Sequence, residues 1–303
     1  MASKDIFSDL DPLISDADEE TFILFSQNLP SQNLGFIDSK AYSLDLTVAG
    51  KDLTISQSPG LLSSTRKDGT TGAVLWKVTH LFAEWIASKG NFLFKRGFAN
   101  TKSTVIELGC GISGLIPLVL APKVGRFIAT DQEYVFKLLR QNLEVNSPNN
   151  GNVRYARGAK RPAGSKLKDS ANNIEVLALD WQGNSASSLS SFLPNESGVD
   201  LIVACDCIYN EELIPPFVDT CVDICRIRQR SKDRDTPTVI AVAQQLRSDR
   251  VFGAWLSAFM KHFDVCKVPD DFEGNPLWSS EGFTLHIAVL KRFEIECGAI
   301  TAG

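Results

Sequence analysis

The sequence predicts a doubly wound α/β fold, in which helices cover both faces of a mostly parallel, seven-stranded sheet. From residue 105 onward, short apolar segments alternate with amphipathic segments, a pattern typical of strands joined by crossover helices. The strand predicted at 199–204 is almost continuously apolar, as expected for a strand covered on both faces. No helix is expected between 263–268 and 283–290, so these last strands can pair antiparallel, and we expect the sheet to end in a reversed strand.

Periodicity and turn signals predict the remaining elements. Alternating apolar residues between Tyr42 and Ser56 flank the segment Ala49-Gly-Lys-Asp52 and predict a β-hairpin ahead of the sheet. Apolar residues at helical spacing predict a helix directly after Trp76. The other expected elements are strands 105–108, 126–130, 174–179 and 238–243 and helices 114–121, 132–146, 248–262 and one from about residue 211.

The chain is expected to consist of an N-terminal extension, residues 1–70, and a main domain, residues 71–295. The extension begins with an acidic, weakly patterned segment and contains the predicted hairpin. Within the main domain, residues 147–173 carry Pro, Gly, Asn and Ser together with six Lys or Arg residues, which predicts a surface insertion.

Composition limits the classes of function. At 303 residues and 44% hydrophobic content, the chain can bury a full core. A net charge of −5 offers no general attraction to nucleic acid, so a direct nucleic-acid substrate is not expected. The chain has no leading apolar stretch and no apolar run long enough to span a bilayer. We therefore expect a monomer without membrane association, in the cytoplasm, with the nucleus as the alternative location.

The cysteines favour core packing over a disulfide framework or a metal site. Their number, seven, is odd, and they are scattered through predicted core segments. Cys205 with Cys207 and Cys221 with Cys225 are the pairs that could contribute to a zinc site, but neither has the spacing of a zinc knuckle. We therefore expect reduced, buried thiols and no bound metal.

The run Val-Ile-Glu-Leu-Gly-Cys-Gly-Ile-Ser-Gly, residues 105–114, is the most informative feature of the chain. It predicts a strand that ends in a glycine-rich turn before a helix, and the next strand ends at Asp131. Glycines at 109, 111 and 114 let the backbone approach a ligand, and Asp131 can accept hydrogen bonds from two ribose hydroxyls. The pattern predicts a nucleoside-cofactor site, with a tight turn that binds nothing as the alternative.

Glu107 distinguishes between two kinds of nucleoside cofactor. A dinucleotide site uses the same glycine pattern to hold a pyrophosphate at a helix N-terminus. An acid two residues before the first glycine would repel that pyrophosphate, whereas it suits the ammonium group of S-adenosylmethionine. We therefore predict S-adenosylmethionine as the cofactor.

Further candidate residues follow the other predicted strands, whose carboxyl ends should meet at one crevice. Asp180 and Trp181 follow the third strand and are placed to flank an adenine, with a helix cap and core packing as their alternatives. Asp206 and Tyr209 follow the fourth strand, and Asp206 could instead cap the next helix. Trp76 precedes a core helix, so its spacing favours core packing over a ligand contact.

In these motifs the chain resembles the seven-β-strand protein lysine methyltransferases of methyltransferase family 16, which have a Rossmann-like sheet. The matching motifs, in order, are Thr71-Gly-Ala-Val-Leu-Trp76, Glu107-Leu-Gly-Cys-Gly-Ile-Ser-Gly-Leu115, Leu179-Asp-Trp181 and Asp206-Cys-Ile-Tyr209. The resemblance covers about residues 40–293, and its departures are the 147–173 insertion and the N-terminus. It implies methyl transfer to a lysine ε-amine, with a large-subunit ribosomal protein as the first candidate substrate and a chaperone or elongation factor as the alternative.

The resemblance also implies roles for individual residues. Those implied to bind S-adenosylmethionine are Trp76, Gly109, Cys110, Gly111, Asp131, Trp181 and Ala204. For Trp76 this replaces the core role that spacing alone favours. Asp206 and Tyr209 are implied to line the lysine channel, where we expect Asp206 to orient the amine and Tyr209 to shape the channel.

Three alternatives belong to other classes of protein. A nicotinamide oxidoreductase would use the same crevice, and a non-catalytic interaction protein with a methyltransferase-like fold would keep the fold without the cofactor. Methyltransferases of amides or cytosine usually carry an Asn-Pro-Pro-Tyr or Pro-Cys motif, and this sequence contains neither.

Overall fold

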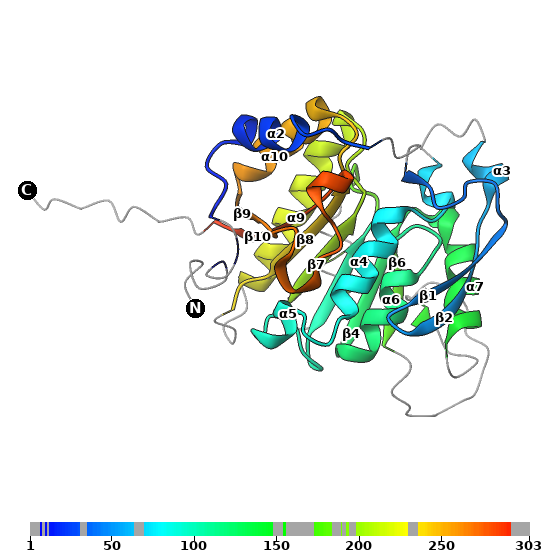
Figure 1. Cartoon of the computed structure of the whole chain (residues 1–303). Coiled ribbons are helices and arrows are strands. Elements are labelled where there is room, and N and C mark those ends of the chain that lie inside the picture. Colours follow the sequence, from blue (N-terminus) through cyan, green and yellow to red (C-terminus); the bar gives the residue numbers. More distant parts are fainter. Residues whose placement is uncertain are drawn as a thin grey trace, which may run out of the picture.

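The computed structural model confirms a doubly wound sheet with helices on both faces (Figure 1). It describes residues 12–30, 35–63, 70–147, 154–155, 173–183, 198–229 and 236–291, together with Phe7, Leu10, Leu189, Phe192 and Leu193. The sheet comprises β3 (Thr104–Leu108), β4 (Arg126–Asp131), β5 (Arg154–Tyr155), β6 (Ile174–Ala178), β7 (Leu201–Cys205), β8 (Val239–Gln245), β9 (Phe263–Lys267) and β10 (Phe283–Leu290). The helices are α2 (Ala17–Phe25), α3 (Pro59–Leu62), α4 (Lys77–Ala87), α5 (Phe92–Lys95), α6 (Leu115–Leu120), α7 (Phe136–Asn146), α9 (Ile214–Gln229) and α10 (Asp249–Met260).

The strand order is β5-β6-β4-β3-β7-β8-β10-β9, and every pair from β5 to β8 is parallel. From β3 the chain first proceeds through β4 to β6 on one side and then continues with β7 and β8 on the other. The order therefore reverses between β3 and β7, where ligands bind in open α/β sheets. Seven strands match the predicted ones, and β5 adds a two-residue strand at one edge. The other residues of the predicted insertion lie outside the described part of the chain, apart from Ser147 and Asn173.

The predicted antiparallel strand near the C-terminus is confirmed as β10, but the sheet does not end with it. β10 is antiparallel to both of its neighbours and lies between β8 and β9, so β9, not β10, forms the edge. The physical reason is burial, because all eight residues of β10 are buried, whereas β9 carries the partly exposed Asp264 and Lys267. An apolar strand needs a neighbour on each side, and a strand with charged residues tolerates an edge.

Alternate residues of the central strands enter two separate cores. On one face, Val105, Phe127 and Val203 pack with α4, α6, α7 and the N-terminal hairpin. On the other, Ile106 and Ile202 pack with α2, α9 and α10. This burial on both faces explains the continuous apolar run of β7 that the sequence shows.

The predicted N-terminal hairpin is confirmed as β1 (Ser43–Val48) and β2 (Lys51–Ser56). Its turn residues, Ala49 and Gly50, both have positive φ (52° and 73°), as a two-residue turn requires. The hairpin lies along α7 (Figure 1), where two asparagine side chains hydrogen-bond to the backbone of β2. Asn142 accepts from the Ser56 N–H at 2.8 Å and donates to the Ser56 carbonyl at 2.9 Å.

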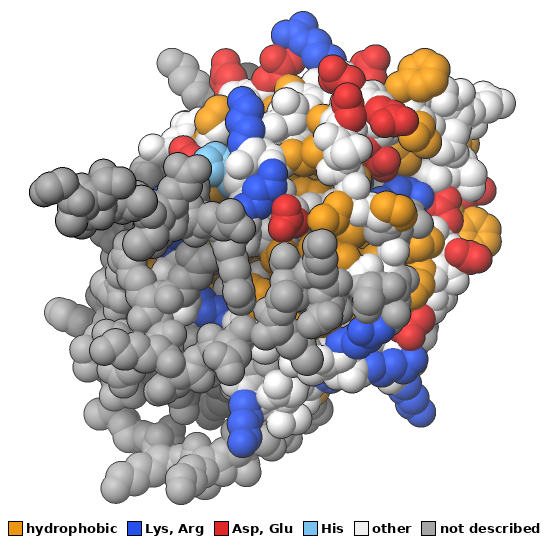
Figure 2. Space-filling view, turned by 90° about the vertical axis from the view of Figure 1, so that its left-hand side faces the viewer, with side chains coloured by type: hydrophobic (Ala, Val, Ile, Leu, Met, Phe, Trp, Pro, Cys, Tyr) orange, Lys and Arg blue, Asp and Glu red, His pale blue; other side chains and the backbone are white. Residues whose placement is uncertain are grey.

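The acidic start of the chain contains a helix that the sequence analysis did not predict. α2 is capped by Asp16, whose side chain accepts from the N–H groups of Asp18 and Glu19, and it packs on α10. Figure 2 shows acidic side chains gathered toward the top of one face of the molecule, the level at which Figure 1 places α2. In the described part of the chain, no helix is both long and apolar enough to cross a membrane.

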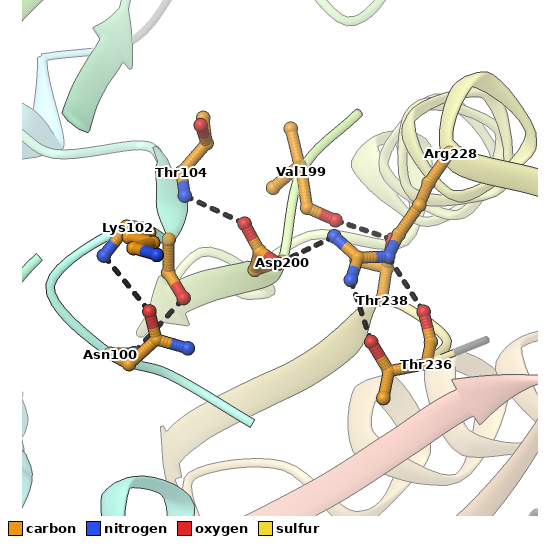
Figure 3. A network of polar contacts seen from close by, with 9 residues as sticks. Asn100, Lys102, Thr104, Val199, Asp200, Arg228, Thr236 and Thr238 are labelled. Carbon is orange, nitrogen blue, oxygen red and sulfur yellow. Dashed lines mark hydrogen bonds and ion pairs between the residues drawn. The ribbon is translucent and has the colours of Figure 1, made fainter. Parts of the chain in front are cut away.

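A buried ion pair joins the strands at their amino ends (Figure 3). Asp200 accepts from the Thr104 N–H at the start of β3 and from Arg228 Nη1 of α9, both at 2.7 Å. Arg228 also donates to the carbonyl and hydroxyl oxygens of Thr236, so this guanidinium is held on several sides. The network lies at the edge of the sheet opposite to the carboxyl ends of the parallel strands, which indicates a structural role.

Candidate active site

The glycine turn after β3 has the conformation that the sequence predicts. Gly109, Gly111 and Gly114 have φ values of 70°, 59° and 64°, a region that other residues rarely adopt. The turn is also crowded, because a Cβ on Gly109 would lie 2.8 Å from the sulfur of Cys207. Neighbouring side chains therefore fill the space beside Gly109, and a side chain at this position would require them to move.

Asp131 at the end of β4 holds this turn in place. One carboxylate oxygen accepts from the Gly111 N–H at 2.8 Å, and the other accepts from the Gln132 N–H at 2.7 Å. Each carboxylate oxygen can accept more than one hydrogen bond, so capacity remains for ribose hydroxyls. Burial raises the pKa of Asp131 to about 6, although both backbone donors oppose that shift. Asp131 therefore makes a structural contact with the glycine turn and keeps acceptor capacity for a ligand.

Glu107, Asp131 and the glycine turn together form the candidate cofactor site, called the cradle below. Glu107 lies in β3 and is almost completely buried. Burial, and to a lesser degree the negative charge of Asp131, raise the pKa of Glu107 to about 8. Its Oε2 atom makes no hydrogen bond to any described residue. A buried carboxyl oxygen that has no hydrogen-bond partner among the described residues, next to a glycine turn, fits a ligand that brings a cationic group.

The remaining predicted cofactor residues adjoin the same turn from three strands. Trp181 follows β6, and its ring lies 3.6 Å from the position of a Cβ on Gly109. Cys110 is buried in the turn, and its N–H donates to the Thr130 carbonyl at 3.0 Å. Ala204, near the end of β7, is fully buried and pairs with Leu108. The structure therefore brings Trp181, Cys110 and Ala204 together around one turn.

Trp76 lies on another side of the crevice and is half-buried. Its indole N–H donates to the Thr71 carbonyl at 3.0 Å, and its ring centroid lies 4.5 Å from that of Phe36. The segment 71–76 touches the glycine turn through Gly72, whose carbonyl accepts from the Ile112 N–H at 2.9 Å. Trp76 is therefore not a fully buried core residue. Its ring contacts Phe36 and the guanidinium of Arg247.

Asp206 directly follows β7 in a left-handed conformation, with a φ of 56°. Its carboxylate is paired with the guanidinium of Arg247, with 2.6 Å between Oδ1 and Nη1. The alternative role of Asp206 as a helix cap is wrong, because Asn210 occupies that position and accepts from the Glu212 N–H. Tyr209 is 45% exposed, so its ring is available to a substrate.

Sequence reasoning missed Arg247 and the N-terminal residues Gly35 and Phe36. Arg247 lies two residues beyond the end of β8, so the rule that identified Asp131 and Asp206 would also have found it. Phe36 had no comparable signal, since its contact with Trp76 joins segments forty residues apart in the chain through an isolated β-bridge.

The cysteines of the described region are free and buried, as predicted. Burial raises the pKa of the Cys205 and Cys207 thiols well above their usual range. Among the described residues, no group of three or more His, Cys, Asp or Glu side chains is arranged to hold a metal ion.

A doubly wound sheet with a glycine turn after its central strand and an acid at the end of the next strand defines a Rossmann-like protein with a candidate nucleoside-cofactor site. Comparison with known proteins identifies the family. The family model described as lysine methyltransferase matches residues 55–157 and 164–256. The chain belongs to this lysine methyltransferase family and is a protein-lysine methyltransferase.

Curated relatives agree with this assignment. The chain is 32% identical to "Ribosomal lysine N-methyltransferase 5" of Zygosaccharomyces rouxii over 73% of this chain and 75% of that protein. The protein of the same name from Candida glabrata is 27% identical, over 86% of this chain and 91% of its own length. A Schizosaccharomyces pombe protein named "Diaminohydroxyphosphoribosylamino-pyrimidine deaminase" is 28% identical, but the chain spans only 53% of it.

One of the solved structures to which this chain is similar is the N-methyltransferase NodS from Bradyrhizobium japonicum in complex with S-adenosyl-L-homocysteine. It is 12% identical, with a TM-score of 0.37, over 69% of this chain and 92% of that one.

The cofactor of this family is S-adenosylmethionine, which supplies an activated methyl group. The residues fit such a ligand, because the glycine turn has the left-handed conformation of a backbone that can approach a ligand and Glu107 has a buried oxygen without a hydrogen-bond partner in the described part of the chain. In such a complex Asp131 would accept from ribose hydroxyls, and Glu107 would face an ammonium group.

Proposed function

We propose that this enzyme methylates a lysine of a large-subunit ribosomal protein, and that it does so in the cytoplasm. The observation that carries this proposal is the similarity to proteins named ribosomal lysine N-methyltransferase 5 over about three quarters of the chain. The charge supports it as well, because a chain with a net charge of −5 attracts a basic substrate. The acidic side chains gathered on one face (Figure 2) add to that attraction.

The proposed cofactor residues are Trp76, Gly109, Cys110, Gly111, Asp131, Trp181 and Ala204, and Asp206 with Tyr209 is proposed to line the lysine channel. Three observations support this division. The glycine turn, Asp131 and Trp181 adjoin one another, Asp206 follows the neighbouring strand, and Tyr209 remains exposed near it. We also retain the division of the chain into an extension, residues 1–70, and a methyltransferase domain, residues 71–295, as a proposal.

The chemistry requires positioning more than acid-base catalysis. The lysine must present a neutral amine, because an ammonium group has no lone pair to attack the methyl carbon. A carboxylate near the amine attracts the cation, yet it also raises the pKa of the amine and opposes deprotonation. Asp206 therefore orients the amine, Tyr209 shapes the channel, and the amine proton leaves to solvent.

The test uses ribosomal large subunits from cells that lack this enzyme. Incubation with the purified protein and methyl-labelled S-adenosylmethionine should label a ribosomal protein, with the labelled lysine identified by mass spectrometry. The label should survive nuclease treatment of the subunits, and the reaction should slow as salt rises. Label in RNA, or in a chaperone or elongation factor with the ribosomal proteins unmodified, contradicts the proposed substrate.

A further inference from the structure

Arg247 forms a bidentate ion pair with Asp206 near the carboxyl ends of the parallel strands. Arg247 Nη1 donates to Asp206 Oδ1 at 2.6 Å, and Nη2 donates to Oδ2. The Asp206 side chain is 4% exposed and that of Arg247 is 23% exposed. The Gln245 N–H also donates to Oδ1, at 3.3 Å. Because the guanidinium is planar, this geometry fixes both the position and the rotation of the carboxylate.

The guanidinium is held from a second side by an aromatic pair. Its central carbon lies 5.1 Å from the ring centroid of Trp76, at cation–π distance. Trp76 in turn packs on Phe36 and donates to the Thr71 carbonyl. Arg247 therefore joins Asp206, at the lysine channel, to the tryptophan at the start of α4.

The N-terminal extension closes the third side. Gly35 has a φ of 86°, and a Cβ there would lie 1.8 Å from Gln245 Oε1 and 2.9 Å from Arg247 Nη2. Arg247 Nη2 donates to that same Gln245 oxygen at 2.8 Å. Backbone of the extension thus lies directly against the ion pair, and only glycine fits there.

We propose that Arg247 is a positioning residue for methyl transfer, which fixes the Asp206 carboxylate and offsets its charge so that the lysine amine is oriented without being retained as ammonium. This inference rests on the proposed role of Asp206 in the lysine channel. From the described residues, Oδ1 accepts two hydrogen bonds and Oδ2 accepts one, from Arg247, so Oδ2 can still accept from an amine N–H. A carboxylate paired with a guanidinium raises the pKa of a nearby amine less than an unpaired carboxylate does.

The elements around Asp206 carry other charged or titratable groups, and every variant proposed below keeps these groups unchanged. On the strands these groups are Glu107, Cys205 and Cys207, and burial raises the pKa of each. On the neighbouring elements they are Lys77, Tyr209, Asp249 and the pair Glu211–Arg250, with Arg250 Nη2 3.2 Å from Glu211 Oε2. A difference between wild type and an Arg247 variant therefore reports on the Asp206–Arg247 pair.

The primary experiment measures kcat and KM against pH for wild type, Arg247→Gln and Arg247→Lys, with the labelled protein as substrate. We expect Arg247→Gln to lower kcat and to move the acidic limb of the profile upward by about one pH unit, because the amine becomes harder to deprotonate. Arg247→Lys restores the charge but not the planar fork, so the limb should return toward wild type while kcat remains reduced. The proposal is overturned if the midpoint of the acidic limb in Arg247→Gln equals that of wild type. It is also overturned if the midpoint in Arg247→Lys does not return toward the wild-type value.

A second variant tests the position of the guanidinium without removing it. Gly35→Ala should lower kcat, since its Cβ displaces Gln245 and Arg247, and Gly97→Ala is the matched control. Gly97 also has a positive φ, 78°, but a Cβ there meets nothing within 4 Å. The two variants therefore carry similar backbone strain, and only Gly35→Ala perturbs the ion pair. Equal kcat values for both variants contradict the inference, even if Arg247→Gln does not fold.

The inference can fail separately from the proposed substrate. S-adenosylhomocysteine affinity is measured by calorimetry for every variant, and kcat is compared at saturating cofactor, because Arg247 also packs on Trp76, a proposed cofactor residue. If wild type labels a protein outside the ribosome, the proposed substrate is wrong, and the same profiles measured on that protein still test the role of Arg247.

Discussion

Replacing Glu107 with glutamine tests whether the cradle holds a protonated carboxyl in the absence of cofactor. Burial raises the pKa of Glu107 from 4.5 to about 8 in the folded protein. A carboxyl with a raised pKa in the folded state stabilises the protein fully below its unfolded pKa, and that stability is lost as pH rises through its folded pKa. The apoprotein should therefore lose stability as pH rises from about 5 to about 8.

The size of the effect follows from the two pKa values. Compared with a carboxyl that stays ionised in both states, protonation of Glu107 adds about 3 kcal/mol to the free energy of unfolding at pH 6. At pH 8 it adds less than about 1 kcal/mol, which is a loss of about 2 kcal/mol. Glu107→Gln keeps the shape of the side chain and removes its titration, so the variant should lack this loss. The two proteins should be closest in stability below pH 4.5, where the group is neutral in both the folded and the unfolded wild type. At pH 6 the unfolded wild type is already ionised, so wild type should be less stable than Glu107→Gln by about 2 kcal/mol.

The assay is urea denaturation at pH 6, 7 and 8, at constant ionic strength and without cofactor, followed by tryptophan fluorescence. The difference in unfolding free energy between wild type and Glu107→Gln should change by about 2 kcal/mol between pH 6 and pH 8. A constant difference would falsify the reasoning, since it would mean that Glu107 is already ionised at pH 6. Adding S-adenosylhomocysteine should flatten the wild-type dependence, because an ammonium group next to Glu107 favours the ionised form.

Three further predictions concern single residues. Asp131→Ala should weaken binding of S-adenosylhomocysteine about tenfold or more, measured by calorimetry, since ribose loses a charge-assisted acceptor and the turn loses a contact; unchanged affinity in a folded variant removes Asp131 from the site. Asp206→Ala should leave that affinity near wild type while methyl transfer drops about 100-fold; equal loss of binding and turnover indicates a local folding defect instead. Asn142→Ala should lower the free energy of unfolding by about 1–3 kcal/mol, because the backbone of Ser56 loses both of its Asn142 partners; denaturation identical to wild type contradicts the role assigned to these bonds.

Much of the fold could be predicted because local sequence and tertiary context agree. The hairpin has a turn residue that favours positive φ, and β7 is apolar without interruption because helices cover both of its faces. The order of the last strands could not be predicted as easily, since local pairing signals do not say which strand of an antiparallel pair lies inside. Polar residues distinguish them, because β9 carries Asp264 and Lys267 whereas every residue of β10 is buried.

The candidate site divides in the same way. Residues at strand ends are predictable from topology, which brings Asp131 and Asp206 to one edge of the sheet. The partner of Asp206 is not predictable from its own motif, because Arg247 comes from another strand end and Phe36 from the extension. Sequence reasoning identifies which groups meet at an edge, and the structure is needed to say which of them neutralise one another.

Two Asp–Arg pairs in this protein illustrate why position in the fold decides the role of an interaction. Asp200–Arg228 lies at the amino ends of the strands, with side chains 9% and 4% exposed. Asp200 also accepts from the Thr104 N–H, and Arg228 also donates to the carbonyl and hydroxyl oxygens of Thr236. Asp206–Arg247 lies at the carboxyl ends, near an exposed tyrosine in the sequence, and Oδ2 of Asp206 accepts a single hydrogen bond from the described residues. Both carboxylates are almost fully buried and need a cation, but only the second adjoins the crevice at which the order of the strands reverses. The arginine that a buried carboxylate requires for stability can thus also tune the charge presented to a substrate.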